Sequence, residues 1–240
     1  MASAKQTPHI NGTIPTPPPQ WAKKKPLLHT LTIAPVTPST LPAYRRLISL
    51  LLPIRYSDKF YYDSIETATS RTIALCALWH DPSAPASEPI VVGGIQCRLR
   101  LIPALPSSPA QGQESLYIQT LATLAPYRYL GVGSALLEAA IEAAIAGNGN
   151  GVVRDVYAHV WEANEDALEW YAKRGFVAEP SVVEGYYRKL RPSGARVVRR
   201  RVGVGEYLRA ENTANGQTGK VDGKSESDQA VDGTNAVANG

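Results

Sequence analysis

The sequence predicts a mixed α+β domain with roughly seven strands and four helices. Short runs rich in Val, Ile and Leu recur between breaks rich in Pro, Gly and Ser, which is typical of strands. Other segments place apolar residues at helical spacing. The order of these segments mixes the two types without an internal repeat, and a mixed α+β domain therefore fits the pattern.

The first third of this domain predicts a strand and two helices. Residues 28–34 alternate apolar and polar side chains, as a half-buried strand does. A helix follows, because apolar residues after Thr40 recur at helical spacing, at Leu41, Tyr44, Leu47, Ile48 and Leu51. Pro53 ends it and makes 52–56 a loop, since proline lacks a backbone donor. A short second helix is expected over 58–65.

The middle third predicts three strands and a helix. Residues 72–79 and 90–101 are apolar runs on either side of a Pro/Ser/Ala stretch, which predicts an antiparallel pair. A second loop, 103–113, leads to a third run at 115–124. A glycine-containing turn then opens an alanine-rich helix that reaches about residue 146, with its apolar stripe at Leu137, Ile141, Ala144 and Ile145.

The last third predicts a strand at 155–160, a well-capped helix and two closing strands at 176–183 and 196–202. Asn164 is the expected N-cap of the helix, and Gly175 its C-terminal stop. The helix begins with acidic residues and ends with basic ones, as the helix dipole favours.

Both ends of the chain are expected to lie outside this domain, which spans 28–210. Residues 1–27 hold six prolines, four lysines and no acid, and 211–240 hold two lysines, five acids and little to bury. We therefore expect a disordered Pro/Lys-rich arm and a disordered acidic tail. Because the arm carries +4, the tail −3 and the whole chain +4, residues 28–210 carry +3. This mild charge does not indicate a specific DNA-binding protein.

Composition also bears on disulfides, metal sites and cellular location. The two cysteines, Cys76 and Cys97, lie in apolar runs without a CxxC pair, and four histidines are scattered, so neither a disulfide framework nor a metal site is expected. No apolar run approaches the ~20 residues that cross a bilayer. A cytoplasmic or nuclear protein that does not bind membranes is the expectation.

The clearest chemical motif is Arg128-x-x-Gly131-x-Gly133 between a strand and a helix. Glycines let the backbone approach a ligand, and the helix N-terminus presents several N–H groups to an anion such as a pyrophosphate. Taken alone, the pattern equally describes a plain strand-to-helix turn whose glycines serve packing.

In its context, this motif resembles the acetyl-coenzyme A loop of the GNAT acetyltransferases. Further segments resemble the NatE-type catalytic subunit, an N-alpha-acetyltransferase, over nearly all of 28–208; these are 116–121, 124–128, 157–160, 164–165, 171–176, 53–61 and 185–189. The resemblance implies a GNAT fold, whose mostly antiparallel seven-stranded sheet splays open between strands 4 and 5. It also implies that acetyl-CoA donates an acetyl group to the α-amine of protein N-termini.

The resemblance implies a catalytic pair, Tyr117 and His159, on two neighbouring strands. Together they would order water and remove the proton from the attacking amine. Since a free α-amine has a pKa of about 7.7–8.0, a modest base is sufficient. Without this context, Tyr117 would be a core aromatic and His159 an ordinary strand histidine.

The cofactor contacts implied by the resemblance come from three segments. Amides of 121–123 would polarise the acetyl carbonyl, and those of 128–134 would hold the pyrophosphate. Asn164 and Tyr171 match positions that contact the pantetheine arm and the departing sulfur. The cofactor-binding residues are then Leu121, Thr123, Arg128, Tyr129, Leu130, Gly131, Val132, Gly133, Ser134, Asn164 and Tyr171.

The peptide would lie between the loop after the first helix and a tyrosine pair near the end of the domain. The substrate-contacting residues implied are Leu52, Pro53, Ile54, Tyr56, Gln119, Tyr186 and Tyr187. An apolar wall with phenol groups suits a first Met followed by a hydrophobic residue. Two positions depart from the family pattern. Leu52 stands where the family often has phenylalanine, and Gln119 stands where the family has an apolar residue. Alternatively, Tyr186 and Tyr187 simply pack under a turn.

Two other functions compete with N-terminal acetylation. The cofactor motif does not choose the acceptor, so lysine side chains or small amines are alternatives. A binding role is the second, through basic residues that would contact RNA, the ribosome or a larger NatA-type acetyltransferase complex; these are Arg188, Lys189, Arg191, Arg196, Arg199, Arg200 and Arg201. Such a run is more often a solvated strand and its turn.

Overall fold

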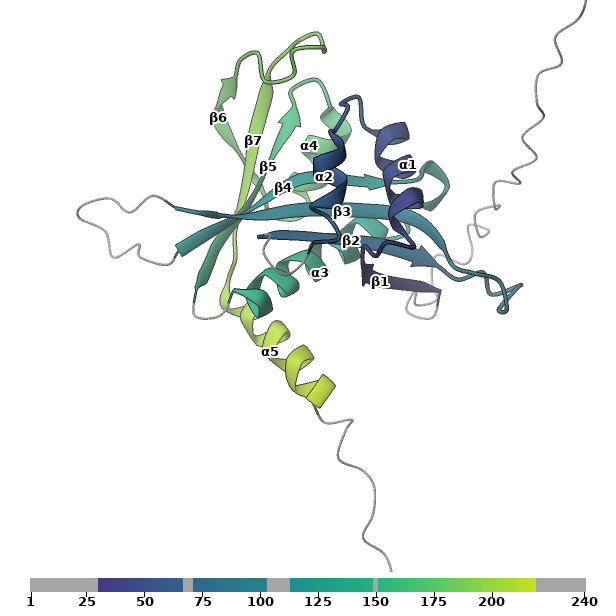
Figure 1. Ribbon diagram of the computed structural model, residues 1–240. Helices are drawn as coiled ribbons and strands as arrows, with labels where there is room; N and C mark the ends of the chain where they lie inside the picture. Colours follow the sequence, from purple (N-terminus) through teal and green to yellow (C-terminus); the bar gives the residue numbers. More distant parts are fainter. Residues whose placement is uncertain (1–29, 67–70, 103–112, 149–150, 219–240) are drawn as a thin grey trace, which may run out of the picture.

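The computed structural model describes residues 30–66, 71–102, 113–148 and 151–218, and it has one seven-stranded sheet at its centre (Figure 1). The strand order is β1-β2-β3-β4-β5-β7-β6, and only the β4–β5 pair is parallel. The strands are β1 Leu31–Pro35, β2 Thr72–Trp79, β3 Ile90–Leu101, β4 Gln113–Thr123, β5 Val152–Trp161, β6 Val177–Val183 and β7 Ala195–Arg201. The predicted mixed, mostly antiparallel sheet is confirmed.

The sheet opens between β4 and β5. Their pairing ends at Ile118 and Ala158, although β4 continues to Thr123 and β5 to Trp161. Beyond that point β4 pairs only with β3, and β5 only with β7. The predicted splay between strands 4 and 5 is therefore present, and it leaves one edge of each strand without a neighbouring strand.

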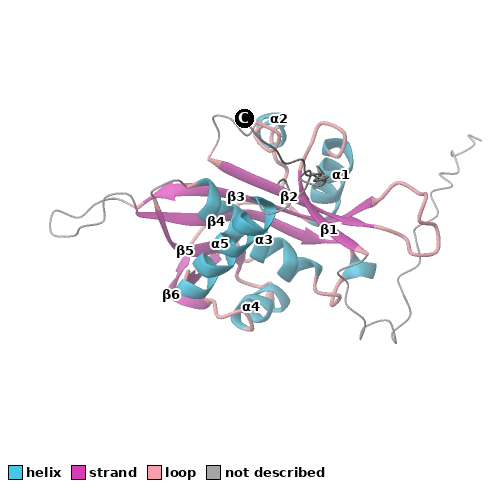
Figure 2. Cartoon of the chain, turned by 90° about the horizontal axis from the view of Figure 1, so that it is seen from below, coloured by secondary structure: helices cyan, strands magenta, loops and turns pink. Residues whose placement is uncertain are grey.

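Five α-helices and a short 3₁₀ helix, η3 Ala125–Tyr127, accompany the sheet in the described part of the chain. Figure 2 shows α1 and α2 on one side of the sheet and α3, α4 and α5 on the other. The helices are α1 Leu41–Leu51, α2 Asp58–Tyr62, α3 Val132–Gly147, α4 Glu165–Ala172 and α5 Val204–Thr218. Two apolar cores result, one under α3 and α4 and one under α1 and α2.

Two adjacent glycines in β3 allow both layers to approach the sheet. Because neighbouring residues of a strand face opposite sides, Gly93 lies under Val132 of α3 and Gly94 under the ring of Tyr44 of α1. A Cβ atom at position 94 would lie 2.5 Å from Tyr44 Cε2, which is closer than atoms can pack. The Gly-Gly pair is thus required by packing on both faces.

Replacing Gly94 with alanine should lower the free energy of unfolding by about 1–3 kcal/mol, because Tyr44 is fully buried and has little room to move. Gly147→Ala is the matched control, since nothing lies within 4 Å of its Cβ position at the end of α3. It should leave stability unchanged or raise it by about 0.4–1 kcal/mol. Urea unfolding of both variants measures this; equal stabilities would contradict the packing argument.

The α4 caps form as the sequence predicts. The Asn164 side chain accepts a hydrogen bond from the Ala167 amide at 3.1 Å, and Gly175 adopts a left-handed φ of 78° just after the helix. In α2, the Ser57 side chain accepts from the Phe60 amide, but the helix ends at Tyr62 and not at 65. Strand β5 is longer than expected at both ends, since it pairs with β4 and β7 together.

Helix α5 was not predicted. It runs through residue 210, where the domain was expected to end, to Thr218, so the expectation of disorder from 211 is wrong for 211–218. The N-terminal arm 1–27 and the tail 219–240 lie outside the described residues. Expected positions 28 and 29 of the first strand also lie outside them, and the strand begins at Leu31.

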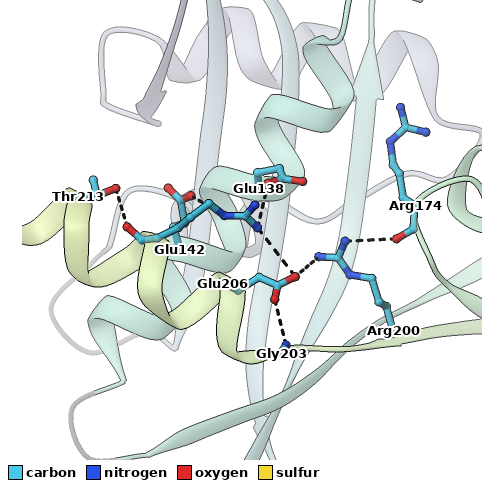
Figure 3. Close-up of polar contacts among 8 residues, drawn as sticks. Glu138, Glu142, Arg174, Arg200, Gly203, Glu206 and Thr213 are labelled. Atoms are coloured by element: carbon cyan, nitrogen blue, oxygen red, sulfur yellow. Dashed lines mark hydrogen bonds and ion pairs between the residues drawn. The ribbon is translucent and has the colours of Figure 1, made fainter.

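Side-chain contacts hold α5 against α3 (Figure 3) and against β5. Arg209 forms ion pairs with Glu138 of α3 at 3.3 Å and Glu142 of α3 at 3.8 Å. The Tyr207 hydroxyl accepts from the Val153 amide at 2.8 Å and donates to the Val153 carbonyl at 3.2 Å. These long-range contacts, rather than local helix propensity, explain why this polar segment is helical.

Candidate active site

An aromatic cluster fills the mouth of the gap between β4 and β5. Tyr117 of β4 stacks on Tyr157 of β5 with ring centroids 4.9 Å apart, and His159 lies edge-on to Tyr117 at 5.5 Å. Tyr186, from the loop after β6, stacks on His159 at 4.3 Å and hydrogen-bonds the Tyr117 hydroxyl at 2.7 Å. Tyr187 then packs edge-on to Tyr186 at 4.9 Å. The structure therefore brings both predicted catalytic residues and both predicted tyrosines together.

The imidazole of His159 is a neutral base in this cluster. Burial is the main reason that its pKa is lowered from the ordinary value of 6.5; the charges of Arg100 and Arg199 act in the same direction, while Glu179 opposes them. Its Nδ1 atom is buried and has no hydrogen-bond partner in the described part of the chain. Tyr187 donates to the His159 carbonyl oxygen at 2.8 Å, which fixes the backbone that carries the ring.

The phenols of Tyr117, Tyr187 and Tyr56 keep their protons at neutral pH. Burial raises the pKa of Tyr117, and its hydrogen bond with Tyr186 adds to the effect. Burial likewise raises the pKa of Tyr187, and it raises that of Tyr56 to about 12. Tyr117 can thus orient a water molecule or donate a hydrogen bond, but proton removal at neutral pH falls to the imidazole.

Backbone amides line the β4 side of the gap. The Leu124 amide donates to the Val92 carbonyl of β3 at 2.9 Å. Since amide direction alternates along a strand, the amides of Leu121 and Thr123 point the other way, into the gap. An oxygen that carries developing negative charge could accept hydrogen bonds from them. Both are residues that the sequence predicted for the acetyl carbonyl.

The loop from Thr123 leads into the N-terminus of α3, where the sequence predicts an anion-binding site. The Arg128 Nε atom donates to the Thr123 carbonyl at 3.2 Å, which ties the loop to β4. Tyr129 and Gly131 both have left-handed φ values, 63° and 88°, so the chain turns sharply into α3. No atom lies within 4 Å of the Cβ position at Gly131. The first amides of α3 have no partners inside the helix, and such amides can bind an anion.

The remaining predicted loop residues lie in the same turn. Leu130 packs against the α3 core and Val132 is buried within it, while Gly133 lies against the Trp170 ring, where a Cβ would come within 3.2 Å. The Ser134 hydroxyl accepts two hydrogen bonds from Arg174, which uses its acceptor positions and leaves its O–H as a donor. For Leu130 to Gly133, the main-chain amides are the polar groups available to a ligand.

Asn164 and Tyr171 lie at opposite ends of α4. Asn164 is exposed and uses its side-chain oxygen for the cap, which leaves its amide donor available. Tyr171 is buried in the core under α4, edge-on to Trp170 at 5.0 Å and to Phe176 at 4.9 Å.

The predicted peptide-binding loop lines a pocket of about 470 Å³ between α1 and α2. Its predicted members are Leu52, Pro53, Ile54 and Tyr56, and the others are Arg45, Ser49, Arg55 and Tyr61. Tyr186 and Tyr187 do not line this pocket, although Tyr186 is close enough to add to the raised pKa of Tyr56, whose main cause is burial. The loop therefore lies near the tyrosine pair, which is part of the His159 cluster.

Gln119 has an unusual place in β4. Gln96 pairs with Thr120 and Cys97 with Ile118, so Gln119 is the extra residue of a β-bulge. The bulge follows Ile118 directly, where pairing with β5 ends. It marks the start of the gap, which is a structural role that the sequence did not indicate.

Sequence reasoning missed two residues of this region. Tyr157 stacks on Tyr117, and its place two residues before His159 on a strand was a usable signal, because such residues share a face. Arg174 was considered only as a helix-terminal charge, yet it binds Ser134 at the start of α3. Over the described ranges, no group of His, Cys, Asp or Glu could hold a metal ion, and no helix is long and apolar enough to cross a membrane.

Residues 41–176 match the model of the Acetyltransferase (GNAT) family. The chain belongs to the GNAT acetyltransferase family. This match spans α1 to the end of α4, and thus includes the predicted catalytic pair, the gap and the predicted anion-binding loop. The GNAT family defines the reaction class, acetyl transfer, and the acceptor has to be inferred from the site.

Relatives of this GNAT protein include the zebrafish (Danio rerio) N-alpha-acetyltransferase 50, which is 31% identical over 173 residues, or 71% of this chain and 88% of the relative. The Drosophila melanogaster probable N-acetyltransferase san is 30% identical over 171 residues, or 71% and 80% of the two chains. Among solved structures, Arabidopsis thaliana Naa50 in complex with the bisubstrate analogue CoA-Ac-MVNAL is 32% identical, with a TM-score of 0.55 over 71% of this chain and 98% of that chain.

Proposed function

We propose that this GNAT protein transfers the acetyl group of acetyl-CoA to the α-amine of protein N-termini, with a preference for Met followed by a hydrophobic residue. The observation that carries the proposal is the neutral imidazole of His159, held beside Tyr117 and Tyr186 next to a gap lined by free amides. The relatives that are N-alpha-acetyltransferases align with most of the domain.

The residues present fit acetyl-CoA. Its phosphates would accept hydrogen bonds from the first amides of α3 and the loop before it, where Gly131 leaves open space. Its thioester supplies the activated acetyl group. The amides of Leu121 and Thr123 would stabilise the charge that develops on the acetyl oxygen.

In the proposed reaction, the uncharged α-amine attacks the acetyl carbonyl, a C–N bond forms and the C–S bond breaks. A water molecule oriented by the Tyr117 hydroxyl carries the amine proton to His159. The Tyr117 phenol cannot serve as the base, because its raised pKa keeps it protonated at neutral pH. The departing thiolate would take up one proton from solvent, which balances the proton that His159 gives up, and Tyr171 and Asn164 lie on the α4 side where the cofactor arm would pass. His159 returns its proton to solvent.

The acceptor preference rests on the pocket and the tyrosines. Leu52, Pro53 and Ile54 offer an apolar wall, with Tyr56 beside it, and Tyr186 and Tyr187 lie across the site. This combination suits an extended peptide that begins with an apolar side chain. The structure of the Arabidopsis relative contains a bisubstrate analogue whose peptide sequence begins Met-Val, which agrees with this preference.

A peptide panel tests the acceptor. Initial rates on peptides that begin Met-Leu should exceed those on peptides with Ser, acidic or internal-lysine acceptors by at least about tenfold, a difference of about 1.4 kcal/mol. A lysine side chain, with a pKa of about 10.4, needs a stronger base than His159 provides. Equal rates on internal lysines would favour the alternative, a lysine or small-amine acetyltransferase.

The pH dependence of the reaction should identify His159. Because its folded-state pKa is lowered below 6.5, the base is active above that pH and is lost as the pH falls through the lowered pKa. The wild-type kcat/KM should therefore fall in acid with two ionisations, those of His159 and of the α-amine at about 7.7–8.0. His159→Gln should retain only the amine ionisation, and an unchanged double fall would contradict this assignment.

Docking to the ribosome or to a NatA-type complex, in the cytosol or nucleus, is a further part of the proposal. The structure narrows the basic surface available for it. Arg199 pairs with Asp155 at 2.7 Å and with Glu179 at 3.0 Å, and Arg200 pairs with Glu206 at 3.5 Å. Arg201, Arg188 and Lys189 are exposed and are the better candidates. Ribosome binding that is insensitive to salt would contradict this role.

A further inference from the structure

Arg174 places a guanidinium group at the start of α3, beside the proposed phosphate-binding amides. Its Nε and Nη2 atoms donate to the Ser134 hydroxyl at 3.0 and 2.7 Å, and Ser134 is the third residue of α3. Its Nη1 atom donates to the Trp170 carbonyl at 2.8 Å, and the group lies over the Trp170 ring at 3.8 Å. Four contacts thus fix the cation against the first turn of the helix.

The backbone of Arg174 is fixed from the opposite side (Figure 3). Arg200 of β7 donates through Nη1 to the Arg174 carbonyl at 3.2 Å. Glu206 of α5 pairs with Arg200 at 3.5 Å and accepts from the Gly203 amide at 3.0 Å. In Figure 3 the Arg174 side chain points away from this network, so β7 and α5 brace the residue while its charge faces elsewhere.

The charge of Arg174 lacks a carboxylate partner among the described residues. Glu138 acts on it only at longer range and is itself ion-paired with Arg209 at 3.3 Å. A guanidinium has five N–H donors, and the contacts above use three, which leaves two. A half-buried cation with free donors next to a helix N-terminus is suited to a phosphate group.

We propose that Arg174 is a phosphate-binding residue of the acetyl-CoA site, where its two free N–H groups bind oxygens of a cofactor phosphate beside the amides of Val132 to Ser134. This inference rests on the proposed cofactor, and it adds the side-chain cation of Arg174 to the main-chain groups proposed above. The sequence motif could not indicate it, because Arg174 lies about 40 residues after the loop.

Calorimetric titration of the full chain with CoA, without any acceptor, tests this role. Arg174→Met should raise the Kd for CoA by about 10- to 100-fold at low salt, as expected for the loss of a charge-assisted hydrogen bond. The difference should shrink in high salt, which screens the charge. Lys173→Met is the matched control; it removes the same charge one residue earlier, where Lys173 is exposed and pairs with Glu169 at 2.6 Å. It should change the Kd by less than about twofold.

Two further variants separate phosphate binding from support of the loop. Ser134→Ala removes the oxygen that Arg174 holds but keeps the guanidinium, and it should weaken CoA binding much less than Arg174→Met. Arg174→Lys keeps the charge and should restore part of the affinity. Thermal unfolding of each variant verifies that it is folded.

Titration with 3′-dephospho-CoA identifies the phosphate. If Arg174→Met weakens the affinity for CoA alone, Arg174 contacts the 3′-phosphate. If it weakens the affinity for both ligands, Arg174 contacts the pyrophosphate. Equal affinities of Arg174→Met and wild type, or equal losses in Arg174→Met and Ser134→Ala, would overturn the proposal while leaving the acetyl-CoA site itself in place. A wild-type chain without affinity for CoA would overturn both.

Discussion

Replacing His159 with glutamine should lower kcat/KM for acetylation of a Met-Leu peptide by about 10²- to 10⁴-fold, the usual contribution of a general base. The reason lies in the cluster: His159 is the only group there that is both uncharged and basic at neutral pH, since burial keeps Tyr117 and Tyr187 protonated. Glutamine keeps a polar side chain of similar size but cannot accept the proton. Initial rates at saturating acetyl-CoA measure the effect.

His80→Gln is the matched control for this variant. His80 lies just after β2, where its Nε2 atom hydrogen-bonds the Thr32 hydroxyl at 3.0 Å, outside the aromatic cluster. Its rate should equal that of the wild type. The CoA affinity of His159→Gln should also be unchanged, which separates loss of the base from loss of the fold. A His159→Gln enzyme within threefold of the wild type would show that the imidazole is not the base.

Replacing Gly131 with valine should raise the Kd for CoA by at least about tenfold. A β-branched residue at a φ of 88° costs about 1–2 kcal/mol, so the turn into α3 would shift. The new side chain would also fill the open space in front of the helix amides, where nothing lies within 4 Å at present. Both effects weaken the anion site, and calorimetric titration with CoA measures their sum.

Gly185→Val is the matched control, because it introduces similar backbone strain outside the proposed cofactor site. Gly185 also has a left-handed φ, 67°, and an open Cβ position, but it lies in the loop after β6 beside Tyr186. Its strain should be similar, and its effect should fall on the peptide KM rather than on CoA binding. Equal CoA affinities of the two variants would mean that the Gly131 turn does not contact the cofactor.

Much of the fold could be predicted because local signals agree with tertiary structure. The strands at 72–79 and 90–101 match β2 and β3 in both limits, since each is a β-branched, apolar run between clear breaks. The cap of α4 by Asn164 and its stop at Gly175 also follow from local chemistry. In these segments propensity, burial and turn residues favour the same conformation.

Helix α5 could not be predicted in this way. Its sequence is polar and includes Gly205, which disfavours a helix. The helix is instead stabilised by contacts of its Tyr207 with β5 and of its Arg209 with α3. These contacts join residues more than 50 positions apart in the chain. A sequence pattern carries no information on such pairs.

In the candidate site, too, some features could be predicted from the sequence and others could not. The positions of Tyr117, His159 and the glycine loop followed from a resemblance, and the structure brings them together around the gap. The bulge at Gln119 depends on the register between β3 and β4, which a strand pattern does not specify. The contact between Arg174 and Ser134 depends on how α4 packs on α3, and only the folded chain shows it.

Mass spectrometry of a Met-Leu peptide that also contains an internal lysine, incubated with the full chain and acetyl-CoA, tests the central claim most directly. The claim predicts one acetyl group, on the first residue, and its absence with His159→Gln. Acetylation of the internal lysine, or none at either position while CoA binds, would contradict it.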